Sequence, residues 1–351
     1  MKLQMHNFSH ADTMPLISIA MATYNGERFI REQLDSIARQ SLLPMELVIT
    51  DDNSTDRTMD IVDEFSRSAP FPVRAVRNPT RLGYAENFLK AASLCAGDII
   101  AFCDQDDIWF ENKLGLCSAC FSDNTIGLVL HSAHTFTQEG IRGHKLPNLP
   151  RNQVLDPCKR DPFRCPPGFA MLFRKDLLRL TDNTHRPWCV QAHDQWRWFL
   201  ATCTGQIALV AESLALYRQH SANTCGAPDP NQRFPTLNHD ATSEDYISIA
   251  ESELDCSRIL TAAAEKHPAR AEWMKQSARK IARRSRLHLI RSRIYAPQSS
   301  LPVRAATVAS IALLGGYIPD PAKMNLGIQA ALKDIFIGLL RSQRRKSQKA
   351  L

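Results

Sequence analysis

The stretch that decides the fold is residues 16–56, LISIAMATYNGERFIREQLDSIARQSLLPMELVITDDNSTD. Its first part, 16–22, and its later part, 45–50, are short apolar runs of the length of buried strands. Between them, residues 28–39 place apolar side chains at the spacing of one helix face. An apolar strand, a helix and a second apolar strand form a βαβ unit, in which the two strands lie parallel.

The same alternation continues along the chain. Further apolar runs occupy 71–76, 98–103 and 128–136, and helical patterns occupy 56–65 and 84–94. We therefore expect an α/β fold with a mostly parallel sheet flanked by helices. In such sheets ligands bind at the carboxyl ends of the strands.

The pattern is less regular after residue 137. Residues 137–167 are rich in Pro, Asn and Gly, which predicts a long loop. Short strands are expected at 169–173, 206–211 and 214–218, with a helix over 192–202 between them.

From residue 243 onward the pattern is helical throughout. We expect four parts: a tail over 1–14, an α/β domain over 15–225, a linker over 226–242 and a basic helical region over 243–351. Within the last part, helices are expected at 244–266, 269–294, 302–314 and 326–344.

Composition excludes several classes of protein. The chain has 351 residues, of which 44% are hydrophobic and 23% charged, as in ordinary globular proteins. Its longest uncharged apolar stretch, 305–317, is shorter than the roughly 20 residues of a membrane-spanning helix. The first 15 residues lack the apolar segment of a signal peptide, so we expect a cytoplasmic protein with reduced thiols.

Charge divides the chain into two unlike parts. Residues 258–351 carry 19 Lys and Arg against 4 Asp and Glu, whereas residues 1–257 carry 24 against 32. The basic clusters 279–293 and 341–349 flank the apolar stretch 305–317. Basic helices with an apolar stripe bind anionic bilayers at their surface, although a charge run can also be a solvated helix face. No nucleic-acid-binding module is recognisable, so nucleic acid is not an expected partner.

Carboxylates gather where two of the apolar runs end. One run is followed by Asp51 and Asp52, and another by Asp104, Asp106 and Asp107. Neighbouring carboxylates repel one another, and a divalent cation relieves that repulsion. Mg²⁺ typically takes one or two carboxylates together with substrate phosphate oxygens. The second cluster therefore predicts a metal–diphosphate site, with a solvated acidic turn and helix cap as the alternative.

Seven segments in a fixed order resemble a known family. They are PLISIAMATYNGERFIREQLDSIARQSL, LVITDDNSTDRT, NPTRLGYAENFLKAA, GDIIAFCDQDDIWFENKL, PPGFAMLFRKDLL, HDQWRWFLA and YRQHSANTCG. Together they resemble a family 2 inverting glycosyltransferase with the GT-A fold, of the rhamnosyltransferase-like group. The resemblance covers residues 16–226 and implies a nucleotide-sugar donor of the UDP or TDP type.

The resemblance assigns a nucleotide site to the first two strand ends. Thr23, Tyr24 and Asn25 resemble the family's nucleotide loop, with Tyr24 stacking on the base. Asp52 resembles the carboxylate that accepts a hydrogen bond from the base imide. Arg81 is a candidate partner of the diphosphate.

The resemblance also assigns a metal and a sugar site. Asp104 and Asp106 resemble the family's metal-binding Asp-X-Asp, with Asp106 as the direct ligand of Mg²⁺ or Mn²⁺. Arg218 or His220 could contact the diphosphate or complete the metal shell, although a structural histidine is also compatible with the sequence. Gly168 suits a backbone that passes close to the donor sugar, or an ordinary turn.

Asp194 resembles the family's catalytic base. A base near the acceptor hydroxyl deprotonates it as it attacks the anomeric carbon. The alternative is a carboxylate that interacts with the helix dipole. Many family members have an acidic residue where this chain has His193, which could adjust Asp194 or pack. Trp188, Trp196 and Trp198 are candidates for stacking on acceptor sugars, Trp198 being the most typical of a core.

The sequence therefore predicts a metal-dependent inverting glycosyltransferase of polysaccharide assembly. Its acceptor would be a growing cell-surface glycan or a lipid-linked sugar, and it would lie peripherally on the inner face of a bacterial membrane. Two alternatives remain: a sugar-nucleotide nucleotidyltransferase, and a non-catalytic, membrane-docked nucleotide-sugar-binding protein. The first would require a Gly-rich basic loop that residues 22–29 lack, and the second leaves Asp194 without a role.

Overall fold

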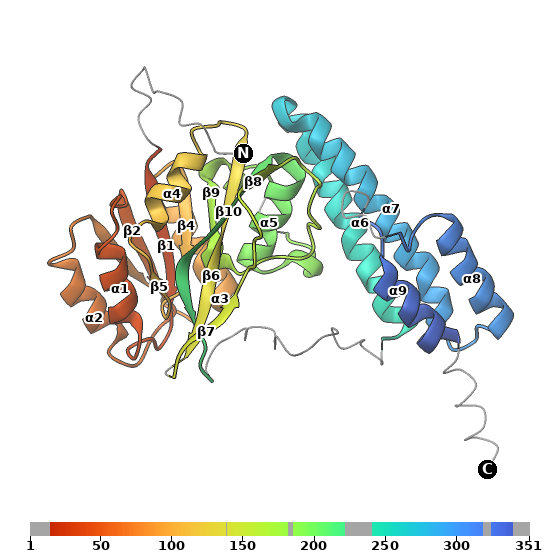
Figure 1. Cartoon of the computed structure of the whole chain (residues 1–351), viewed down its shortest axis with the longest axis horizontal. Helices are drawn as coiled ribbons and strands as arrows, with labels where there is room; N and C mark the ends of the chain where they lie inside the picture. The colour runs from red at the N-terminus through yellow and green to blue at the C-terminus, as the bar shows by residue number, and fades with distance from the viewer. Residues whose placement is uncertain (1–14, 138, 182–184, 222–240, 319–323, 340–351) are drawn as a thin grey trace, which may run out of the picture.

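A computed structural model describes residues 15–137, 139–181, 185–221, 241–318 and 324–339. The expected tail over 1–14 and residues 226–240 of the expected linker lie outside this part of the chain. A twisted sheet with helices on its faces forms one end of the molecule, and a bundle of helices forms the other (Figure 1).

Within the described residues ten strands form one sheet, in the order β3-β2-β1-β4-β9-β6-β10-β5, with β7 paired to β6 and β8 to β10. The strands are β1 (Ile17–Thr23), β2 (Glu46–Asp51), β3 (Val73–Arg77), β4 (Ile99–Cys103), β5 (Ile108–Trp109), β6 (Ile126–Thr137), β7 (Gly140–Lys145), β8 (Gln153–Leu155), β9 (Met171–Arg174) and β10 (Gln206–Arg218). The first four strands pair in parallel, as predicted. Strand β9 lies antiparallel to both β4 and β6, so the sheet as a whole is mixed.

Helices cover the sheet and continue beyond it. They are α1 (Ile30–Ala38), α2 (Thr58–Ser66), α3 (Tyr84–Leu94), α4 (Lys113–Cys120), α5 (His193–Thr204), α6 (Ser243–Lys266), α7 (Ala271–Tyr295), α8 (Leu301–Leu313) and α9 (Ile328–Lys333), which continues as a π-helical turn over Asp334–Leu339. The helix α1 buries Ile30, Leu34 and Ile37, which recur at the period of one helix face.

Strand register brings the polar strand ends together. Thr23, the last residue of β1, is paired with Asp51, the last residue of β2. On the other side of β1, Met21 is paired with Cys103, the last residue of β4. The loops that follow these three strands therefore leave the sheet at the same edge.

Two predicted segments differ from the structure. The expected loop over 137–167 contains β7 and β8, because strands that pair on one side only need no continuous apolar run. The two strands expected at 206–211 and 214–218 are one strand, β10, whose pairing with β6 shifts register between Val210 and Leu216. Such bulges interrupt the alternation of side chains and make one strand resemble two.

The helical region consists of two differently packed halves. Leu260 on α6 and Ile281 on α7 belong to the same apolar core as the sheet. Farther along, Leu287, Ile294 and Ile311 form a separate small core between α7 and α8. None of the described helices is long and apolar enough to cross a membrane.

Candidate active site

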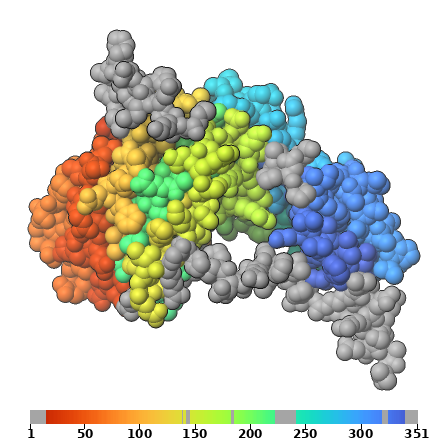
Figure 2. Space-filling view, viewed as in Figure 1, coloured from red at the N-terminus to blue at the C-terminus, as the bar shows by residue number. Residues whose placement is uncertain are grey.

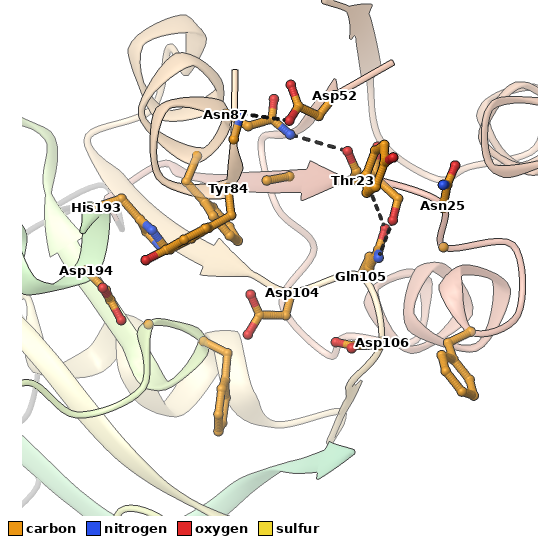
Figure 3. A pocket seen from close by; sticks show the side chains of 18 of the residues that line it. Thr23, Asn25, Asp52, Tyr84, Asn87, Asp104, Gln105, Asp106, His193 and Asp194 are labelled. Atoms are coloured by element: carbon orange, nitrogen blue, oxygen red, sulfur yellow. Dashed lines mark hydrogen bonds between the residues drawn. The ribbon is translucent and has the colours of Figure 1, made fainter. Parts of the chain in front are cut away.

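A cavity of about 880 Å³ opens at the carboxyl ends of β1, β2 and β4. The residues that the resemblance assigns to the nucleotide, the donor sugar, the metal and the catalytic base all line it, apart from Arg218. In the close-up view Asp104 lies between Asp106 and Asp194, while Thr23 and Asn25 lie toward the other end (Figure 3). The cavity therefore extends from the predicted nucleotide loop to Asp194, the predicted catalytic base.

The nucleotide loop is fastened from two sides. The hydroxyl of Thr23 donates to Asp51 Oδ1 over 2.9 Å. The amide of Gln105 binds the backbone of Tyr24 twice, accepting from its N–H and donating to its carbonyl, each over 3.0 Å. A Cβ on Gly26 would lie 2.3 Å from Gln105 Oε1, so this clamp requires glycine there. Sequence reasoning missed Gln105, because the middle residue of Asp-X-Asp carries no pattern of its own.

The carboxylate of Asp52 organises the loop after β3. Its Oδ1 accepts from the Leu82 N–H at 2.6 Å and from Asn78 Nδ2 at 3.1 Å. Its Oδ2 accepts from the Gly83 N–H at 2.9 Å. Asp52 therefore positions Arg81, which also lies 3.9 Å from its Oδ2. Its contact with a base imide stays a prediction.

Arg81 and Tyr24 lie face to face at the mouth of the cavity. The guanidinium carbon of Arg81 is 3.9 Å from the centre of the Tyr24 ring, a cation–π contact. The neighbouring Asn25 has a φ of +46°, a left-handed conformation that Asn tolerates. Its Oδ1 accepts a hydrogen bond from the Thr55 N–H, so the loops after β1 and β2 are connected.

The acidic cluster after β4 is electrostatically strained. Desolvation, then the charge of Asp106 and then that of Asp194, raise the pKa of Asp104 to about 8. Burial and the same cluster raise the pKa of Asp107 well above its ordinary value. Asp107 accepts a hydrogen bond from the Arg218 N–H at 3.0 Å and is fully buried. Asp107 therefore connects the Asp-X-Asp loop to the end of β10 and does not line the cavity.

The side chains of this cluster fit a divalent cation that is bound partly by the protein and partly by the oxygens of a substrate diphosphate. Asp106 Oδ2 lies 2.8 Å from His220 Nε2, and Asp104 contributes a second carboxylate that is destabilised by its neighbours. In the part of the chain that the structure describes, no three His, Cys, Asp or Glu side chains form a complete metal site by themselves. A cation held by few side chains and by substrate phosphates needs no such group.

Arg218 differs from the other residues assigned to the donor or the metal in that it does not line the cavity. Its Nε donates to the backbone oxygen of Asp106 at 2.7 Å, and its NH2 nitrogen lies 2.9 Å from Glu32 Oε2. Register shifts precede Arg218 in β10, so the direction of its side chain cannot be predicted from the alternation of side chains along the strand. In the structure Arg218 thus holds the Asp-X-Asp loop through the Asp106 carbonyl, and its contact with the donor stays a prediction.

Asp194 lies in the first turn of α5, beside Gly168. Its Oδ1 accepts from the Gln195 N–H at 2.8 Å. A Cβ on Gly168 would be 3.1 Å from the Asp194 Cβ and 3.2 Å from His193 Nε2. Glycine at 168 therefore permits the close approach of this turn to α5.

His193 is a neutral imidazole in an aromatic cluster. Its ring stacks on Phe88 with centroids 4.0 Å apart, and it meets the edge of Phe102 at 4.8 Å. Burial lowers its pKa to about 4. Tyr84 and Phe88 also line the cavity from α3 and had no sequence signal beyond a helical pattern.

The tryptophans do not behave as one group. Trp196 and Trp198 are buried in the core and cannot stack on a sugar, which corrects the expectation for Trp196. Trp188 is 53% exposed but does not line the main cavity.

Comparisons with known proteins agree with this geometry. Residues 18–180 match the Glycosyl transferase family 2. The dTDP-rhamnosyl transferase RfbG of Shigella flexneri is 31% identical over 225 residues, covering 59% of this chain and 74% of that protein. The UDP-Glc:alpha-D-GlcNAc-diphosphoundecaprenol beta-1,3-glucosyltransferase WfgD of Escherichia coli is 33% identical over 128 residues, covering 36% of this chain and 49% of that protein.

A solved structure shares the fold over nearly the whole chain. TarS 1-349 of S. aureus, in complex with UDP-GlcNAc, has a TM-score of 0.56 and covers 94% of this chain and 92% of its own, at 17% identity. At that identity the likeness concerns the fold alone. The family match covers β1, β2 and β4 with the loops that carry Tyr24, Asp52 and Asp106, and RfbG is matched over 74% of its own length at 31% identity. The chain therefore belongs to glycosyl transferase family 2 and has the GT-A fold.

Proposed function

We propose that the protein transfers a sugar from a nucleotide-diphosphate donor to a hydroxyl of a growing cell-surface glycan or a lipid-linked acceptor, with inversion. The observation that carries this proposal is the single cavity in which Asp104 and Asp106 adjoin Asp194 and the nucleotide loop. A phosphate-facing acidic pair and a separate carboxylate are the two elements that a single displacement requires.

Each side chain has one task in the proposed reaction. Tyr24, Asp52 and Arg81 bind the nucleotide, and the Gly168 turn lets the donor sugar approach Asp194. Asp194 accepts the proton of the acceptor hydroxyl while the acceptor oxygen bonds to the anomeric carbon from the face opposite the nucleotide. The bond from that carbon to the diphosphate breaks, and the nucleoside diphosphate leaves.

Asp106, Asp104 and His220 are the residues that would hold Mg²⁺ or Mn²⁺. When bound, the cation would offset the negative charge that develops on the leaving diphosphate. Burial, followed by the charges of Asp106 and Asp194, raises the pKa of Asp104, and a positive partner would offset both effects.

The relatives support two kinds of donor. RfbG is named a dTDP-rhamnosyl transferase, which supports TDP and rhamnose. WfgD is named for a UDP-glucose donor and a diphosphoundecaprenol acceptor, which supports UDP and a lipid-linked acceptor. On the latter ground we place the protein in the cytoplasm, peripherally on the inner face of the cell membrane.

We also propose functional bounds for the parts of the chain. Residues 15–225 would form the catalytic domain and 226–242 the linker, and residues 243–351 would form the basic helical region. The start of α6 at Ser243 supports this division. The core shared by the sheet, α6 and α7 supports close attachment of the helical region to the catalytic domain.

The decisive experiment is a donor screen followed by turnover. Thermal shift with UDP, TDP and GDP sugars identifies the ligand, and donor hydrolysis with Mn²⁺ then shows whether the bound sugar is released. Binding without hydrolysis or transfer, at any acceptor tried, would favour a non-catalytic binding protein. Stabilisation by none of the nucleotides would refute the proposal.

A further inference from the structure

The helix α7 has two chemically different faces. Ser277 on one face donates through Oγ to the Cys203 carbonyl of α5 at 3.1 Å. Arg284 on the same side pairs with Asp161 of the sheet domain at 2.9 Å and with the buried Glu253 of α6 at 2.8 Å. These contacts attach α7 to the rest of the protein and leave its other face exposed.

The exposed face of α7 is a basic stripe. Lys275, Arg279, Arg286 and Arg293 are all exposed. At 3.6 residues per turn, separations of four and seven residues bring these side chains to within about 40° of one another around the helix axis. At about 1.5 Å per residue the stripe is roughly 27 Å long.

Next to this stripe the protein exposes a large apolar surface. Among the described residues, Leu313 is 89% exposed and Phe336 is 60% exposed. Further large apolar side chains of the same region that are exposed are Leu289, Leu301, Val303, Leu314, Ile318, Ile328, Leu332 and Ile335. Many exposed large apolar side chains in one region are typical of an interaction site in a folded protein.

Hydrogen bonds join the two features. An NH2 nitrogen of Arg283, on the exposed side of α7, donates to the Leu314 carbonyl over 2.5 Å. The end of α8 therefore lies beside the basic stripe, and Arg304 of α8 donates to the Gly338 carbonyl of the π-helical turn at 3.1 Å. In the space-filling view α8 and α9 lie at the end of the molecule away from β1 and β2 (Figure 2).

The charge of this region is mostly of one sign, although Glu272 in the first turn of α7 is an exposed carboxylate near Lys275. The described residues from 273 to 333 contain no Asp or Glu, and the one acidic residue of that stretch, Asp320, lies outside them. The next carboxylate, Asp334, is fully buried and paired with Arg291 at 2.8 Å. An anionic surface would thus meet no exposed carboxylate among these residues.

We propose that the basic stripe of α7 and the exposed apolar side chains of α8, α9 and the π-helical turn form one surface that docks on an anionic lipid bilayer. We call this the distal surface. It rests on the proposed function in one respect, that a lipid-linked acceptor is reached at a membrane. The basic side chains contact lipid phosphates, and the apolar side chains enter the interface between headgroups and acyl chains.

The test is sedimentation of the full chain with phosphatidylcholine vesicles, with and without phosphatidylglycerol. Wild type should bind only the anionic vesicles, and added salt should weaken binding because it screens the basic stripe. Arg279→Gln, Arg286→Gln and Arg293→Gln together should weaken partitioning on the order of 100-fold, since each basic residue contributes a factor of about five.

A second variant tests the apolar part of the distal surface. Leu313→Ser with Phe336→Ser should weaken binding by at least about tenfold, since each removes a large apolar group from the interface. Leu43→Ser with Ile141→Ser is the matched control, because both side chains are exposed apolar residues of the sheet domain. The control should bind vesicles as wild type does.

Several results would overturn the proposal. One is equal binding to neutral and anionic vesicles, and another is wild-type binding by both variants. A third is a lipid-free dimer of wild type that the Leu313 and Phe336 substitutions abolish, which would make the distal surface a contact between two copies of the chain. Donor hydrolysis in lipid-free buffer is measured in parallel. If the wild type did not hydrolyse the donor, that result would count against the proposed function, and the vesicle-binding result would still decide the docking proposal.

Discussion

Replacing Asp194 by Asn separates chemistry from binding at one position. The change is nearly isosteric, and the amide oxygen of Asn can keep the 2.8 Å hydrogen bond from the Gln195 N–H. We therefore expect the fold to be retained. The free energy of unfolding should fall by about 0.3 to 1 kcal/mol, because a carboxylate at a helix N-terminus is lost.

The structure also predicts the direction of the change in nucleotide affinity. Burial and Asp106 raise the pKa of Asp104 most, and the charge of Asp194 raises it further, so these two carboxylates repel each other. Removing that charge also removes repulsion from an anionic diphosphate near Asp104. Affinity for the nucleoside diphosphate should stay equal or become slightly tighter.

Transfer should respond in the opposite way. Loss of a positioned base reduces the rate by about 10² to 10⁴, or roughly 3 to 5 kcal/mol of transition-state stabilisation. The loss should appear in kcat and kcat/KM together, because the interaction is made in the transition state. Affinity is measured by calorimetry and transfer rate on the same preparation.

The matched control is Asp60→Asn. Asp60 is an exposed carboxylate in the first turn of α2 and does not line the cavity. It should reproduce the small stability effect with no loss of rate. If Asp194→Asn transferred sugar at close to the wild-type rate while binding donor normally, Asp194 would have no part in the chemistry.

Three further changes test the remaining parts of the cavity. Asp106→Asn should abolish most transfer and the response to Mg²⁺ or Mn²⁺, because a neutral amide is a poorer ligand for a hard cation; full wild-type activity in EDTA would contradict this. Asp52→Asn should weaken nucleotide binding in calorimetry by about 1.5 to 3 kcal/mol, because the loop at Leu82 and Gly83 loses hydrogen bonds to a charged acceptor, and unchanged affinity would refute that role. His193→Phe tests acid stability: burial lowers the pKa of His193 from 6.5 to about 4, so between these values the unfolded chain binds a proton that the folded chain does not, and wild type loses stability as the pH falls. Between about pH 7 and about pH 5 the free energy of unfolding, measured by urea denaturation, should fall by roughly 2 kcal/mol more in the wild type than in His193→Phe. Equal decreases would show that His193 is not the group responsible.

The sheet was predictable where its strands are buried on both faces. Continuous apolar runs at 16–22, 45–50 and 98–103 correspond to β1, β2 and β4, because a parallel strand covered by helices needs no polar alternation. The polar edge strands β7 and β8 had no such signal and were expected as loop.

The site was predictable where chemistry lies at the end of a strand. Asp52, Asp104 and Asp106 follow buried strands directly, so their convergence at one edge follows from parallel pairing. Arg218 also ends a strand, but after the register shifts in β10 its side chain binds the Asp106 carbonyl and Glu32 and does not line the cavity. Sequence position alone cannot specify side-chain direction past a bulge.

The sequence by itself determined the buried parallel strands, the helices between them and which carboxylates meet at the sheet edge, because these follow from local periodicity and strand direction. Only the tertiary structure decided the neutral state of His193, which depends on Phe88 of α3 and Phe102 of β4. It also decided which face of α7 attaches to the sheet domain and which stays exposed. Desolvation and pairing depend on groups that are distant in the chain and become neighbours only after folding, and no local pattern records them.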